Sequence, residues 1–152
     1  MKHFQTIILA SSITLLTFTS PAIQAHSDEP VASKARHGGQ VRVAGANNFE
    51  LVVAKVSSNT KDNPIIVFVT DRAGTNVSTV GASGTATILA GKTKATVPLV
   101  ADGDNRLKGT ADVASTADMK VVVSIALAGK ASAQARFTPL AIEKDENTGH
   151  KH

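Results

Sequence analysis

The middle of this chain consists of short runs of β-type residues separated by clusters of glycine, asparagine and aspartate. Short runs bounded by turn residues at this spacing are typical of an all-β domain. The runs predict seven strands: Gln40–Ala44, Phe49–Val56, Pro64–Thr70, Thr85–Ala90, Thr93–Val100, Lys120–Ala128 and Ala131–Thr138. No convincing amphipathic helix interrupts them. We therefore expect a small antiparallel β-sandwich of about seven strands with an immunoglobulin-like arrangement.

Proline and glycine positions refine this arrangement. The run Pro64–Thr70 is apolar on both faces after its proline, which predicts a central strand. Pro98 has no amide hydrogen, which favours a sheet edge or a bulge. The tetrapeptide Leu89-Ala90-Gly91-Lys92 is echoed by Leu127-Ala128-Gly129-Lys130, and each copy predicts a hairpin turn between two strands.

The amino-terminal residues have the pattern of a secretory signal peptide. Lys2 is followed by the apolar, uncharged stretch Thr6–Phe18, and Pro21 precedes Ala22-Ile23-Gln24-Ala25. This pattern predicts export and cleavage after Ala25, so that the mature chain starts at His26. Because the short signal carries no anchor and the sequence lacks wall-sorting features, we expect the periplasm as the destination.

These features divide the chain into four parts. We expect a signal peptide at residues 1–25, a flexible lead-in at 26–36, the β-sandwich domain at 37–139 and a flexible, histidine-containing tail at 140–152. The longest later apolar run, Ile65–Val69, is far shorter than the roughly 20 residues that cross a bilayer. We therefore expect no membrane insertion after the signal is removed.

The composition argues against several classes of function. The sequence contains no cysteine, which excludes disulfides, thiolate metal sites and cysteine nucleophiles. It also contains no tryptophan or tyrosine to stack on bases, and its basic residues are scattered, so we expect no nucleic-acid partner. With few histidines and no positioned acid–base pair in the predicted domain, we do not expect an enzyme.

The histidines are the candidate metal ligands. Cleavage after Ala25 would free the amino group of His26, which together with its imidazole suits Cu(II), and His37 could add a third nitrogen. His150 and His152 could bind a divalent ion weakly on the carboxyl-terminal tail. The alternative is that His26 is incidental to the cleavage site and that the tail is simply solvated.

Several short motifs in order along the chain carry a resemblance to a known group of proteins. They are His37-Gly38-Gly39-Gln40-Val41, Phe49-Glu50-Leu51-Val52, Val69-Thr70-Asp71 with Gly74, Gly81-Ala82-Ser83-Gly84, Gly103-Asp104-Asn105-Arg106-Leu107-Lys108-Gly109 and Ala135-Arg136-Phe137. In this order they resemble small, largely uncharacterised periplasmic proteins associated with heavy-metal efflux systems of the resistance-nodulation-division type. The resemblance covers roughly residues 37–138.

The resemblance implies a β-sandwich that acts beside the export of copper, zinc, cobalt or cadmium, by binding the ion or contacting the efflux complex. Such relatives often place a histidine just before the Phe-Glu-Leu segment, whereas this chain has Asn47 and Asn48 there. Asparagine is a poor substitute for imidazole toward transition metals, so this departure weakens metal binding at His37. Glu50 is a possible carboxylate neighbour of His37 if the first two strands form a hairpin.

Two functions from different classes follow. The first is a periplasmic accessory protein of heavy-metal homeostasis or efflux, which captures copper or another divalent transition metal weakly through His37, His26 and Glu50, with His150 and His152 on the tail, and hands it to an export complex. The alternative is a non-catalytic interaction module that adds a partner strand to an exposed sheet edge and needs no metal.

Overall fold

The computed structural model describes residues 34–142, and every regular element in this range is a β-strand. The eight strands are β1 (Gln40–Ala44), β2 (Asn47–Val53), β3 (Asn63–Asp71), β4 (Ser83–Ala90), β5 (Thr93–Ala101), β6 (Arg106–Ala111), β7 (Lys120–Ala126) and β8 (Ala133–Phe137). The predicted signal peptide, most of the lead-in, and His26, His150 and His152 lie outside the described residues.

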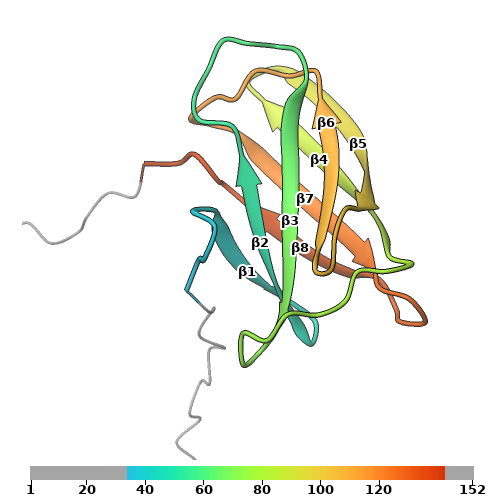
Figure 1. Cartoon of the computed structure of the whole chain (residues 1–152). Helices are drawn as coiled ribbons and strands as arrows, with labels where there is room; N and C mark the ends of the chain where they lie inside the picture. The colour runs from blue at the N-terminus through green and yellow to red at the C-terminus, as the bar shows by residue number, and fades with distance from the viewer. Residues whose placement is uncertain (1–33, 143–152) are drawn as a thin grey trace, which may run out of the picture.

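All strand pairings are antiparallel, and they form one continuous sheet in the order β1-β2-β3-β6-β5-β4-β7-β8. The half β1-β2-β3-β6 faces the half β5-β4-β7-β8 (Figure 1). The two halves are joined through β5 and β6, whose ladder contains only the pairs Val100 with Lys108 and Ala101 with Leu107. The all-β prediction is confirmed, whereas the immunoglobulin-like sandwich of seven strands is not confirmed.

The sheet is nearly closed on itself, because its first and last strands lie side by side. At one end the backbone amide of Thr138 donates a hydrogen bond to Oε1 of Gln40, at 2.8 Å. At the other end an ideal Cβ on Gly45 would lie 3.6 Å from the Cβ of Ala133. Between residues 34 and 142, no backbone ladder joins β1 to β8. We call this unpaired junction the β1–β8 seam.

The core fills the space enclosed by the curled sheet. Alternate residues of each strand point inward, as the period of two along a strand requires, and all eight strands contribute to one apolar cluster. Its largest fully buried side chains include Phe49, Leu51, Ile88, Leu107 and Ile125. This core fixes the positions of the outward-facing residues on β2 and β3, where the first candidate site lies.

The strand that the sequence did not predict is β6. Only Leu107 and Ala111 point into the core from it, and Arg106, Lys108 and Gly109 give it no clear β-type run. Gly109 is required by close approach, because a Cβ there would lie 2.5 Å from the carbonyl oxygen of Pro98 on β5. The close approach of β5 therefore explains the glycine at position 109.

The predictions of a central strand at β3 and of two hairpins are confirmed. The run at β3 is central, since it pairs with β2 and β6. The two echoed tetrapeptides connect β4 to β5 and β7 to β8, as hairpins. The prediction of a sheet edge or a bulge at Pro98 is not confirmed, because β5 lies between β6 and β4. Pro98 lies outside the short β5–β6 ladder, so its missing amide hydrogen removes no bond from that ladder.

Candidate functional site

The carboxylate of Glu50 is the centre of the best-defined polar site. It accepts hydrogen bonds from the backbone amides of Arg36 at 3.0 Å, His37 at 2.7 Å and Gly39 at 3.1 Å. Its Oε2 also lies 3.0 Å from Nδ1 of His37. Glu50 is only 6% exposed. The β1–β2 hairpin predicted to bring His37 and Glu50 together is present, and the two side chains are in contact.

The backbone before β1 folds so that three amides point at one carboxylate. Gly38 has a φ of +75°, a left-handed conformation that suits glycine and turns the chain between His37 and Gly39. Gly39 then packs so closely on the backbone of Leu51 that a side chain there would collide with it. The two glycines of the His-Gly-Gly motif therefore serve backbone geometry.

The ring of His37 is held on its face as well as at Nδ1. It stacks on Phe68 with the ring centroids 3.5 Å apart and the planes inclined by 6°. Phe68 stands opposite Glu50 in the β2–β3 ladder, so the aromatic ring and the carboxylate are neighbours on the outer face of the sheet. Two independent contacts therefore fix the orientation of the imidazole.

Burial raises the pKa of Glu50, but the hydrogen bonds from His37 and from the amides of Arg36, His37 and Gly39 lower it by more. The net pKa lies below the ordinary glutamate value, and the carboxylate is ionised at neutral pH. The hollow beside it, also lined by Lys34, Arg36 and Thr70, has a volume of about 10 Å³. With four hydrogen bonds and two cationic residues around it, Glu50 is placed to orient His37 rather than to coordinate an ion.

Because Nδ1 of His37 contacts Glu50, Nε2 is the ring nitrogen that can bind a ligand. When Nδ1 carries the proton toward a carboxylate, Nε2 keeps a lone pair for a metal ion, an arrangement in which carboxylates commonly orient metal-binding histidines. Nε2 has no hydrogen-bond partner within residues 34–142, and the His37 side chain is 41% exposed. The site can therefore present one oriented imidazole to a ligand from outside.

The described part of the chain contains no group of three or more histidine, cysteine, aspartate or glutamate side chains that could hold a metal ion. At the position just before Phe49, the side chain of Asn48 donates to the carbonyl oxygen of Asp71 at 2.9 Å. Asn48 is thus part of the hydrogen bonding between strands. His37 and Glu50 are the two predicted site residues that the structure brings together; the remaining candidates lie outside the described residues.

Phe68 is the site residue that the sequence prediction missed. A signal existed in the run Ile65–Val69, which is apolar on both faces although only one face points into the core. An aromatic ring on the outer face of a strand would expose apolar surface to water, and in this structure the stacked ring of His37 shields Phe68.

Comparison of the chain with protein-family models, curated proteins and solved structures finds no match. Within residues 34–142, no helix is long and apolar enough to cross a membrane. The case for any function therefore rests on the residues and contacts described above.

Proposed function

We propose that the protein is a periplasmic, non-catalytic accessory protein of heavy-metal homeostasis, in which His37 captures a copper or another divalent transition-metal ion for transfer to an efflux complex. The observation that supports this proposal is the orientation of His37 by Glu50 and Phe68, which leaves Nε2 without a hydrogen bond to residues 34–142 on a side chain that is 41% exposed. In the mature chain, the free amine and imidazole of His26 would supply further nitrogen ligands. One imidazole alone binds weakly, which suits capture followed by transfer.

Titration calorimetry of the tag-free mature chain, residues 26–152, with Cu(II), Zn(II) and Ni(II) tests this proposal. The key variant is His37→Phe, which retains an aromatic ring to stack on Phe68 and removes the nitrogens. We expect stoichiometric binding by the natural chain and its loss in His37→Phe. In Glu50→Gln, where the orienting carboxylate is gone, we expect binding about 10- to 100-fold weaker.

The matched control is the double variant His150→Ala/His152→Ala, which removes the tail imidazoles and leaves His37 unchanged. It should bind as the natural chain does. Thermal unfolding followed by circular dichroism verifies that each variant is folded. Binding of equal strength in His37→Phe, or no stoichiometric binding in any protein, would contradict a role for His37 as a metal ligand.

The β1–β8 seam favours a second candidate, the interaction module that adds a strand to a sheet edge. Two unpaired edges facing each other could both bond to a strand inserted between them. This function needs no histidine, so capture of a partner would survive replacement of His26, His37, His150 and His152. Metal transfer would be abolished by the same replacement.

A further inference from the structure

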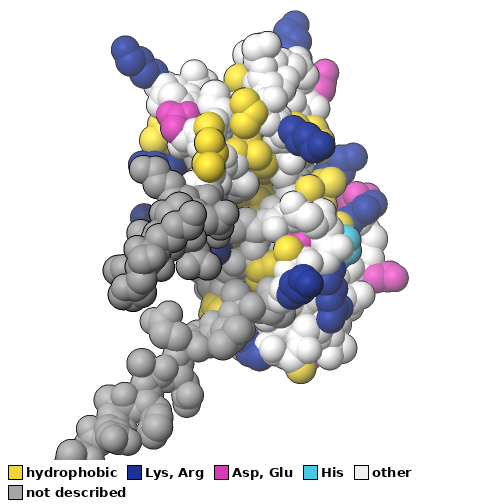
Figure 2. Space-filling view, turned by 90° about the vertical axis from the view of Figure 1, so that its left-hand side faces the viewer, with side chains coloured by type: hydrophobic (Ala, Val, Ile, Leu, Met, Phe, Trp, Pro, Cys, Tyr) yellow, Lys and Arg dark blue, Asp and Glu magenta, His cyan; other side chains and the backbone are white. Residues whose placement is uncertain are grey.

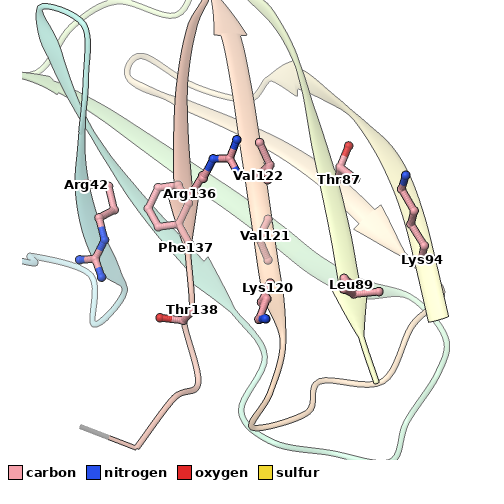
Figure 3. A pocket seen from close by; sticks show the side chains of 10 residues that line it. All are labelled: Arg42, Thr87, Leu89, Lys94, Lys120, Val121, Val122, Arg136, Phe137 and Thr138. Carbon is pink, nitrogen blue, oxygen red and sulfur yellow. The ribbon is translucent and has the colours of Figure 1, made fainter. Parts of the chain in front are cut away.

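A second site lies on the outer face of the other half of the sheet, away from Glu50. It is a groove of about 510 Å³ that crosses strands β5, β4, β7 and β8 and reaches β1 across the seam. Lys94, Lys120, Arg136 and Arg42 are its cationic lining residues, and Leu89 and Val122 provide apolar surface between them (Figure 3). We call it the basic groove.

The ladder registers explain how charged and apolar residues come to alternate along it. Leu89 stands opposite Lys94 on one side and Lys120 on the other, so two cations flank one apolar residue. In the next row, Val122 stands opposite Arg136. These residues face outward because their neighbours Ile88, Val121 and Val123 point into the core. The groove is therefore a consequence of the strand pairing.

The charge of the groove is uncompensated by close carboxylates. No acidic residue lines it, and none of its four cations takes part in an ion pair with a carboxylate of residues 34–142. Asp118 attracts Lys120 electrostatically from outside the groove without forming an ion pair. Leu89 remains 41% exposed between its two lysines. An anionic partner with apolar parts would complement both features.

Figure 2 shows the side of the molecule that lies at the left in Figure 1. On it, hydrophobic side chains gather in a hollow, with lysine and arginine side chains on either side. A combination of exposed apolar surface and one sign of charge is typical of a surface that binds a partner.

The length of the groove selects the kind of partner. Neighbouring strands are about 4.8 Å apart, so Lys94 and Lys120 are separated by roughly 10 Å, and the path from β5 to β1 is on the order of 19 Å. A single phosphate or carboxylate would reach only one or two of the cations. An extended peptide rises about 3.3 Å per residue and presents side chains on one face about every 7 Å, so seven residues span the groove.

We propose that the basic groove binds an extended segment of a partner protein in which acidic and apolar residues share one face, because they alternate at every second position of the segment. The carboxylates of the segment pair with Lys94, Lys120, Arg136 and Arg42, while its apolar side chains cover Leu89 and Val122. This binding does not involve His37 and stands independently of the proposed metal function.

The test uses the mature chain, residues 26–152, and a fluorescein-labelled peptide with the sequence acetyl-Glu-Ser-Leu-Ser-Glu-Ser-Glu-amide, followed by fluorescence anisotropy. When the peptide is extended, its glutamates and its leucine lie on one face. The variant Lys94→Glu/Lys120→Glu reverses two charges inside the groove. The matched control, Lys61→Glu/Lys108→Glu, makes the same change in net charge at exposed positions that do not line it. We expect at least a tenfold rise in dissociation constant for the groove variant, less than twofold for the control, and weaker binding at high salt.

Two further experiments distinguish specific binding in the groove from general attraction between opposite charges. A peptide with glycine in place of its leucine keeps the charge and should bind several-fold more weakly. The unchanged peptide should also bind several-fold more weakly to Leu89→Ser than to the natural protein. Vesicles of phosphatidylglycerol test a lipid surface as the alternative anion. Equal losses in the two charge-reversal variants, no effect of the apolar changes, or binding to the vesicles without binding to the peptide would each overturn the proposal.

Discussion

At the scale of single residues, Glu50 does two things at once. It anchors the chain segment that leads into β1 through three backbone amides, and it orients His37. A buried carboxylate that accepts this many hydrogen bonds stabilises the fold as long as it stays ionised. Its contribution to stability can therefore be measured separately from any contribution to binding.

Replacing Glu50 by glutamine should destabilise the protein by about 1–3 kcal/mol at pH 7, because an amide group then faces donors that need an acceptor. Urea unfolding should be followed by circular dichroism, since the chain has no tryptophan or tyrosine. Asp104→Asn, at an exposed side chain, is the matched control and should change stability by less than about 0.5 kcal/mol. Equal stability of Glu50→Gln and the natural protein would mean that the amides find other acceptors.

The same pair of proteins should show a defined dependence on pH. The pKa of Glu50 is lowered in the folded state, so its contribution is fully present above the unfolded value of about 4.3 and is lost as the pH falls through the folded value. The difference in unfolding free energy between the natural protein and Glu50→Gln should shrink steadily below about pH 4.3. A difference that stayed constant from pH 7 to pH 3 would contradict the assignment to this carboxylate.

The residues of the candidate site were predictable in part. His37 and Glu50 were expected to meet because a short hairpin between two adjacent strands brings nearby sequence together. The role of Glu50 as a hydrogen-bond acceptor for the segment before β1 was not predictable. Its partners are backbone amides, and their direction depends on the conformation of Gly38. Phe68 was not singled out, because a short apolar run does not reveal which face an aromatic ring occupies.

At the scale of elements, strands with a clear apolar pattern were predicted within a few residues, and β1 was predicted with its observed bounds. β6 was missed because the properties that place it in the sheet belong to its neighbours. Its glycine is required by β5, and its lysine and arginine point away from the core. Contacts of this kind arise between segments and are not encoded in the local pattern.

Gly109→Ala should therefore destabilise the protein by roughly 1–3 kcal/mol, because the added methyl group collides with the carbonyl of Pro98 and with Val97. Thr110→Ala, at the exposed next position of the same strand, should have a much smaller effect. Urea unfolding measures both. If the two substitutions cost the same, the loss would reflect strand propensity and not the close approach of β5 and β6.

At the scale of the whole molecule, the β1–β8 seam is the one place where neighbouring strands lack a ladder, within the part of the chain that the structure describes. A Cβ on Gly45 would lie 3.6 Å from that of Ala133, which suits a disulfide. The double variant Gly45→Cys/Ala133→Cys should form this bond on oxidation, since the chain has no other cysteine. Because Gly45 has a left-handed backbone, with φ +59°, a cysteine there is strained, and this strain offsets part of the stability that the disulfide adds.

The oxidised double variant should be more stable than its own reduced form by about 2–4 kcal/mol, measured by urea unfolding with and without reductant. If the seam accepts an inserted strand, oxidation should also block partner binding and reduction should restore it. Failure of the two thiols to join, or partner binding that oxidation leaves unchanged, would contradict the closed seam or the inserted strand respectively.

The adjacency of β1 and β8 also governs how the domain is made. The first strand finds its last neighbour only after the final strand has left the ribosome, so no shorter product can complete the cylinder. Contacts between the two ends of a chain slow folding, because a long loop must close before they form. We therefore expect folding on the scale of milliseconds to seconds, with an interval after synthesis in which the growing sheet offers β7 as an open edge.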